Sequence, residues 1–284
     1  MRKPLLALLA ATAMLPAPAL AQREPAASGA AARTATGTTP RLELTAEQRT
    51  ELRQAVMRGR ALAVLDQAGR VSTRDMLARV PAADRGALAG WIAQPEGNGV
   101  TVTYFSREGE GFAAVYRSQM LGGRITSPQV FPAGSRPALT GPAARMAAAR
   151  MAAEGLQNRP CGPEFNYLVL PPEGQGPVLV YQMSPRTAAA KVPVGGHFRT
   201  AIGADGAVVA TAPLSGACQD LTLARVPAGQ RPRPLPVSAP DMTLPNELHV
   251  FLALWTGRPI AVATGSSPTR LWGVTGDGIA ELQQ

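Results

Sequence analysis

The residues most able to do chemistry lie in one short stretch, VPVGGHFRTAIGADGAVV at residues 192–209, which holds one of only two histidines in the chain. If HFRTAIG is a strand, alternation places His197 and Arg199 on one face and Phe198 and Ile202 on the other. Phe198 and Ile202 have the character of core residues, so we expect His197 and Arg199 near the surface. A histidine beside a guanidinium could act as a general acid or base. His197 and Arg199 are therefore the candidate catalytic residues, although the edge of an ordinary hairpin is the favoured interpretation.

The motifs of common catalytic and ligand sites are missing. No serine lies in a G-x-S-x-G motif, and neither a phosphate-binding loop nor a calcium loop is present. We expect His249, in NELHVFLALW, to lie on a strand as a structural hydrogen-bonding group. The two histidines and two cysteines lack the close pairs of common zinc sites, so we expect no cofactor and no metal site. Metal binding by His197 and His249 together remains a lesser alternative.

The only two cysteines, Cys161 and Cys218, are interpreted as a disulfide. An even pair in an exported chain favours a bridge. The alternatives are a catalytic thiol, which an oxidising compartment would put at risk, or a metal site.

The first residues indicate export. The stretch MRKPLLALLAATAMLPAPALA has a basic start at Arg2 and Lys3, a short apolar run and a small-x-small end. This is the pattern of a secretory signal peptide, with cleavage expected after Ala21. The apolar run is too short to span a bilayer comfortably, so we expect a periplasmic or secreted protein without integral membrane insertion.

The positive charge of the chain is almost entirely arginine. Residues 1–21 hold two of the 28 lysines and arginines and none of the 19 acids, so their removal lowers the net charge from +9 to +7. Such a charge fits an anionic envelope component, or it reflects only a biased genome. The arginines form no cluster, so we do not expect nucleic-acid binding.

Helical patterns occupy the first part of the chain. Thr45 and Gln48 form a predicted capping box for a helix that should stop between Asp66 and Gly69. Two short helices are expected next, over STRDMLARV, capped by Ser72 or Thr73, and over PAADRGALAGWI. Alternating strands follow at GVTVTYFSREGEGFAAVYRSQM, and an alanine-rich helix at GPAARMAAARMAAEGL.

The second half of the chain is predicted to be β-structure throughout, including ELHVFLALW, with type I′ turns at Asp205-Gly206 and Asp277-Gly278. The expected fold class is α+β: a helical N-terminal part with a small antiparallel sheet, then a mostly antiparallel β part stapled by one disulfide. The predicted organisation is a signal peptide (1–21), a disordered tether (22–40), a helical and small-sheet region (41–136), a connecting helix (137–159) and a β region (160–284). A proline-rich crossover is expected at 226–245.

Several of these segments resemble a loose group of exported bacterial proteins without assigned activity. The shared pattern is a cysteine before EFNYLVLPP, then VYQMSPRTAAAKVPVGGHFRTAIGADG, a second cysteine and PNELHVFLALWTGRPIAVAT. The resemblance implies an exported, disulfide-bonded α+β protein and carries over no catalytic residue.

These observations favour a non-enzymatic periplasmic or secreted binding module, associated with an envelope protein or an anionic envelope component. The alternative is an envelope hydrolase that uses His197 with Arg199 and a distant carboxylate or serine. Enzymatic activity is thus left open, with a binding role favoured.

Overall fold

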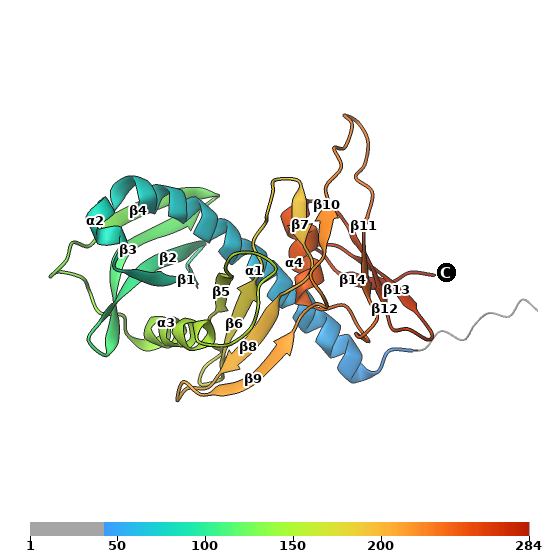
Figure 1. The fold of residues 1–284 in the computed structure, drawn as a ribbon, viewed down its shortest axis with the longest axis horizontal. Coiled ribbons are helices and arrows are strands. Elements are labelled where there is room, and N and C mark those ends of the chain that lie inside the picture. Colours follow the sequence, from blue (N-terminus) through green and yellow to red (C-terminus); the bar gives the residue numbers. More distant parts are fainter. Residues whose placement is uncertain (1–42, 284) are drawn as a thin grey trace, which may run out of the picture. The chain divides into compact units, whose positions relative to one another are not determined.

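The computed structural model describes residues 43–283 (Figure 1). The predicted signal peptide and tether lie outside the described residues. No helix among residues 43–283 is long and apolar enough to cross a membrane.

A single long helix, α1 (Ala46–Arg79), begins at the predicted capping box. Thr45 Oγ1 accepts from the Gln48 N–H at 3.2 Å, and Gln48 Oε1 accepts from the Thr45 N–H at 2.9 Å. The predicted stop at Gly69 and the predicted cap at Ser72 or Thr73 are both wrong, because the helix continues through them. Gly69 provides room for Trp91, whose ring atoms lie 2.5–2.9 Å from where a Cβ would be. Tertiary packing here outweighs the low helix propensity of glycine.

The first sheet is an antiparallel meander in the order β1-β2-β3-β4. Its strands are β1 (Leu88–Glu96), β2 (Gly99–Glu108), β3 (Gly111–Leu121) and β4 (Arg124–Val130). The predicted helix over PAADRGALAGWI is wrong, since only α2 (Ala82–Arg85) is helical and β1 starts three residues later. The C-terminal half of α1 covers one face of this sheet, and α3 (Gly141–Glu154) packs on the other.

The second sheet contains the stretch with the candidate residues. Its strand order is β5-β6-β8-β9 and every pair is antiparallel. The strands are β5 (Asn166–Leu170), β6 (Val178–Met183), β8 (Phe198–Ile202) and β9 (Val208–Pro213). The β8–β9 hairpin is confirmed, but its turn is not type I′, because Gly206 has a φ of 81° while Asp205 has no positive φ. Two short strands, β7 (Lys191–Pro193) and β10 (Asp220–Thr222), form an antiparallel pair of their own. In the sequence, β7 precedes the β8–β9 hairpin and β10 follows it.

The C-terminal part corrects the all-β expectation. ELHVFLALW is not a strand but most of helix α4 (Glu247–Thr256), which begins at an Asn246 cap and ends at Gly257 with a φ of 66°. Helix α4 connects the parallel pair β11 (Leu235–Ala239) and β12 (Ile260–Thr264). Strands β13 (Arg270–Val274) and β14 (Ile279–Glu281) complete this third sheet in antiparallel fashion.

One disulfide, Cys161–Cys218, links positions 57 residues apart. In the chain-entropy model a loop of this length contributes about 4 kcal/mol to stability. The α+β class, the antiparallel sheets and the predicted disulfide are confirmed in the described residues.

Candidate functional site

His197 is buried rather than near the surface, which corrects the sequence-based expectation. The residue lies one position before β8 and is 1% exposed, and its Nδ1 accepts a hydrogen bond from the Ser184 N–H at 3.1 Å. With Nδ1 as an acceptor, Nε2 carries the proton and donates to the Pro193 carbonyl at 3.1 Å. Burial lowers the pKa of His197 to about 4. Both ring nitrogens are therefore used in hydrogen bonds to the backbone of nearby residues.

The expectation failed because both faces of the second sheet are covered. Ile202 on one face packs with α3, and Tyr181 on the other face packs in the core that α1 and α4 share. The prediction from strand alternation assumed that one face of this sheet was exposed to solvent.

His249 is a capping residue of α4. Its Nδ1 accepts from the Asn246 N–H at 3.1 Å, while Asn246 Oδ1 accepts from the Leu248 N–H at 3.0 Å. Burial lowers the pKa of His249 to about 4. His249 also lines a cavity of about 460 Å³ beside Cys218. In the described part of the chain no three His, Cys, Asp or Glu side chains are grouped so that they could hold a metal ion.

Arg199, the second candidate residue, forms an ion pair with Glu247 at the start of α4. Its Nη1 donates to Glu247 Oε1 at 2.6 Å, and the Tyr181 hydroxyl donates to the same oxygen at 3.0 Å. The Glu247 side chain is 3% exposed and that of Arg199 31% exposed. Burial works against the charge of Arg199, but the Glu247 carboxylate and Tyr181 outweigh it and raise its pKa.

Three elements position this pair. Tyr181 on β6 lies directly opposite Arg199 on β8 in the sheet register, so both side chains lie on the same face. Glu247 is the first residue of α4, where the positive end of the helix dipole favours a carboxylate.

A cavity of about 520 Å³ opens beside the pair, and we call it the Arg199–Glu247 pocket. Its walls come from α1, the strands β8 and β9, the loop after β11 and the start of α4. Its lining residues are Glu51, Gln54, Ala55, Arg58, Arg199, Ala212, Pro213, Leu214, Asp241, Met242, Thr243, Leu244, Asn246 and Glu247.

Three further charges on this lining are unpaired. The side chains of Glu51, Arg58 and Asp241 make no hydrogen bond or ion pair with any other residue between 43 and 283. The pocket therefore presents one free guanidinium and two free carboxylates next to a satisfied Arg199–Glu247 pair.

Sequence reasoning found Arg199 but missed the groups that it meets. Glu247 was placed on a strand, although Asn246 followed by Glu247 and a later Gly257 are helix start and stop signals. Glu51 and Arg58 had no distinguishing signal, because they sit on a helix whose neighbours in space are distant in sequence.

No serine is arranged as a nucleophile in the described residues. The Ser184 hydroxyl donates to the Gly196 carbonyl at 2.8 Å and accepts from the Cys161 N–H at 2.9 Å. Ser215 accepts from the backbone N–H of His197 at 3.4 Å, and no serine hydroxyl between residues 43 and 283 is hydrogen-bonded to a histidine ring. The nucleophile–base contact of acyl-transfer enzymes is thus not formed there.

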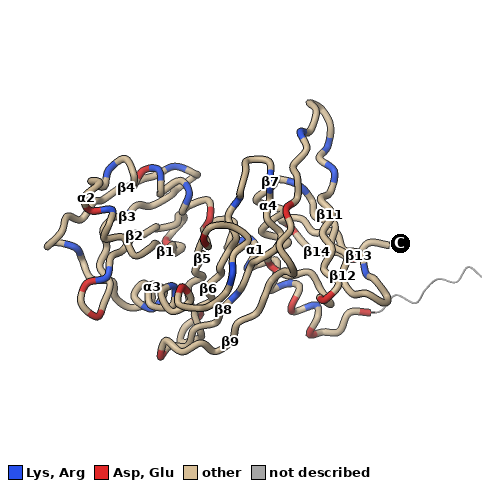
Figure 2. Tube along the Cα trace, viewed as in Figure 1, with Lys and Arg blue, Asp and Glu red and all other residues tan. Residues whose placement is uncertain are grey.

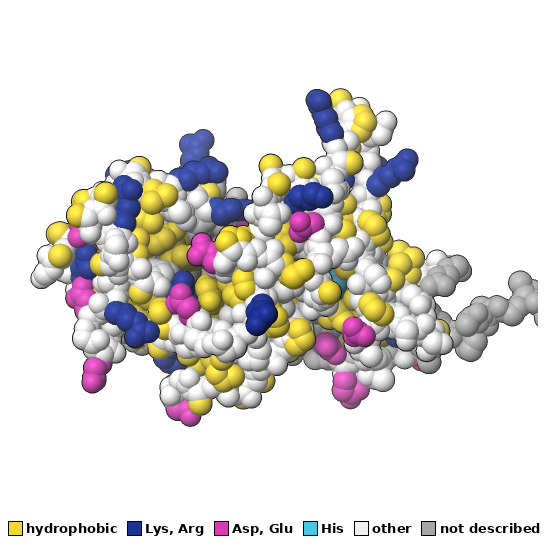
Figure 3. Space-filling view, in the orientation of Figure 1, with side chains coloured by type: hydrophobic (Ala, Val, Ile, Leu, Met, Phe, Trp, Pro, Cys, Tyr) yellow, Lys and Arg dark blue, Asp and Glu magenta, His cyan; other side chains and the backbone are white. Residues whose placement is uncertain are grey.

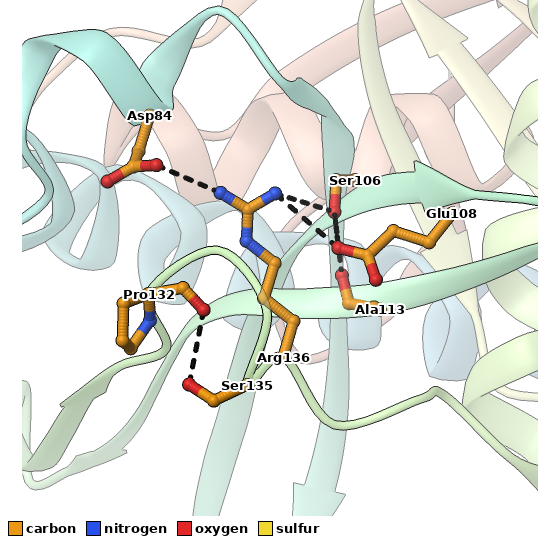
Figure 4. A network of polar contacts seen from close by, with 7 residues as sticks. All are labelled: Asp84, Ser106, Glu108, Ala113, Pro132, Ser135 and Arg136. Atoms are coloured by element: carbon orange, nitrogen blue, oxygen red, sulfur yellow. Dashed lines mark hydrogen bonds and ion pairs between the residues drawn. The ribbon is translucent and has the colours of Figure 1, made fainter.

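A second charged cluster surrounds Arg136 (Figure 4). Its guanidinium contacts Asp84 Oδ1 at 3.1 Å, Ser106 Oγ at 3.4 Å and Glu108 Oε1 at 3.5 Å. The Arg136 side chain is 7% exposed. Because these contacts connect α2, β2 and the loop after β4, we interpret the cluster as structural.

Comparisons of the chain with protein-family models, with curated proteins and with solved structures find no match.

Proposed function

We propose that the chain is an exported, non-enzymatic binding module of the bacterial envelope, periplasmic or secreted, whose ligand occupies the Arg199–Glu247 pocket. The observation that carries the proposal is the set of unpaired charges on one cavity: Arg58 against Glu51 and Asp241. The disulfide fits an oxidising compartment and supports export.

The charges favour a small ligand that carries both signs, such as a free amino acid or a short peptide. Its carboxylate would pair with Arg58 and the half-exposed Arg199, and its ammonium group with Glu51 or Asp241. Because the Arg199–Glu247 pair is already formed, it fixes the position of the Arg199 guanidinium before a ligand arrives.

A calorimetric titration tests this proposal with amino acids and di- and tripeptides, compared with the same compounds blocked at both ends. The unblocked compounds should bind, and the blocked ones should bind at least tenfold more weakly, since a charge-assisted hydrogen bond contributes about 1.5–3 kcal/mol.

Variants Arg58→Gln and Asp241→Asn should each weaken binding about tenfold or more. Arg53→Gln is the matched control, because Arg53 is an exposed residue of the same helix and does not line the pocket. Equal affinity in wild type and both pocket variants would contradict the site.

The alternative, a hydrolase that uses His197, has less support. Both ring nitrogens of His197 are hydrogen-bonded to backbone groups, and the residue is 1% exposed. An esterase, peptidase and phosphatase panel should therefore show no difference between wild type and His197→Gln, and a loss of turnover in the variant would favour the hydrolase.

A further inference from the structure

The segment between β10 and β11 projects from the rest of the described chain (Figure 1). We call residues 225–234, RVPAGQRPRP, the arginine arm. Its two ends are fixed: the Leu223 N–H donates to the Ala190 carbonyl at 2.8 Å, and the Leu235 N–H donates to the Pro259 carbonyl at 2.9 Å. The Arg258 guanidinium also donates to the Ala224 carbonyl. The arm therefore extends from a rigid base.

The charge of the arm has a single sign. Arg225, Arg231 and Arg233 are all exposed, and none of them makes an ion pair with another described residue. No carboxylate occurs in the sequence between Asp220 and Asp241. In Figure 2 the projecting part accordingly carries basic positions and no acidic ones.

The backbone of the arm is restricted before it meets any partner. A turn at its end is closed by the Gln230 N–H on the Pro227 carbonyl at 3.2 Å, and Gly229 supplies the positive φ of 79° that the turn requires. Pro227, Pro232 and Pro234 fix further φ angles. The backbone of the arm therefore has less conformational entropy to lose on binding than an unrestricted loop.

The end of the arm is small and mostly apolar, and Gln230 is the one polar side chain between Arg225 and Arg231. Val226, Pro227 and Ala228 lie between Arg225 and the two later arginines, and Figure 3 shows hydrophobic side chains next to basic ones at this end. The three prolines have no N–H that would lose water on burial. An apolar tip flanked by guanidinium groups matches the layering of a lipid surface, where phosphates lie above the acyl chains.

We infer that the arginine arm is a docking element for an anionic lipid surface, with its tip at the boundary between headgroups and acyl chains and its three arginines on lipid phosphates. An acidic polymer would satisfy the arginines but offers no apolar layer for the tip. The inference is independent of the ligand pocket, because no arm residue lines it.

Vesicle co-sedimentation tests the inference, with the protein purified in the form that the exporting cell produces. The vesicles are phosphatidylcholine alone, or phosphatidylcholine with about a third phosphatidylglycerol, in about 0.1 M salt. We expect binding only to the anionic vesicles, and its loss in about 1 M salt, where charges are screened.

The triple variant Arg225→Gln, Arg231→Gln, Arg233→Gln should lower the partition coefficient on the order of a hundredfold, since each basic residue near such a surface contributes about a fivefold factor. The matched control is Arg53→Gln, Arg74→Gln, Arg124→Gln, which removes the same charge from exposed positions elsewhere and should keep most of the binding. Ala228→Asp should weaken binding at least fivefold, because it places a carboxylate at the tip.

Three results would overturn the inference: no binding of the wild type to anionic vesicles, an equal loss in the control triple variant, or binding to soluble polygalacturonate that persists without any vesicle binding. An unchanged partition coefficient for Ala228→Asp would overturn the placement of the tip at the boundary between headgroups and acyl chains.

Discussion

At the scale of single residues, the imidazole rings of His197 and His249 are neutral and form hydrogen bonds to backbone groups. Each accepts a hydrogen bond at Nδ1 from a main-chain N–H, and burial lowers the pKa of each to about 4. Histidine in an unfolded chain titrates near pH 6.5, so the unfolded state binds more protons than the folded state between pH 4 and 6.5. Their contribution to stability is full above pH 6.5 and is lost as the pH falls through about 4.

We therefore expect the free energy of unfolding to be about 2 kcal/mol lower per histidine at pH 5 than at pH 7.5. Urea unfolding at the two pH values measures this difference. His197→Gln keeps one acceptor and one donor at the ring position but does not titrate, so its pH dependence should be shallower. If His197→Gln and His249→Gln both keep the wild-type pH dependence, the protons are taken up elsewhere.

At the scale of secondary-structure elements, α1 packs on its two neighbours through glycines. A Cβ at Gly59 would lie 2.5 Å from Val250 Cβ and 2.7 Å from the Glu247 carbonyl oxygen, both on α4. Gly69 has the same role toward Trp91. The Gly59 contact brings the backbones of α1 and α4 close together next to Glu247, which lines the pocket.

Gly59→Ala should consequently destabilise the protein by about 1–3 kcal/mol, because the carbonyl oxygen belongs to the backbone and cannot swing aside. Helix propensity alone predicts the opposite, a gain of about 1 kcal/mol. The control is Gly86→Ala: Gly86 has a φ of −64° and nothing within 4 Å of an added Cβ. The midpoint of chemical denaturation distinguishes the two, and a gain in Gly59→Ala would contradict the packing described.

The elements that sequence reasoning found are those with local signals. The capping box of Thr45 and Gln48 and the hairpin around Gly206 depend on a few adjacent residues, and both are present. Helix α4 was mistaken for a strand because it is apolar on nearly every side, and a helix buried all round shows no 3.6-residue period. The length of α1 was missed because Trp91 fills the space left by Gly69, which only the folded structure reveals.

The pocket could be predicted only in part. The sequence pointed to Arg199 as a candidate residue, but its partner Glu247 is 48 positions away. His197 was placed near the surface because strand alternation says nothing about whether a second layer covers that face. Contacts between distant segments are a property of the packed chain and not of any short window.

At the scale of the whole molecule, the bridge between Cys161 and Cys218 is the only covalent cross-link in the described chain. Replacing both cysteines by serine should lower the free energy of unfolding by about 4 kcal/mol. A reducing agent should shift the wild type toward the variant and leave the variant unchanged. Unfolding curves with and without reductant measure this, and two free thiols in the native protein by mass spectrometry would contradict the bridge.

The same bridge determines whether a single proteolytic cut separates the chain into two pieces. Residues 161–218 form a closed covalent ring that contains β5 to β9 and Arg199. A single cut at the exposed Asp205–Gly206 turn would open the ring without releasing a fragment, and the severed strands would re-pair at the high effective concentration of a linked chain. A cut in the arginine arm lies outside the ring, and it would divide the chain into two separate polypeptides.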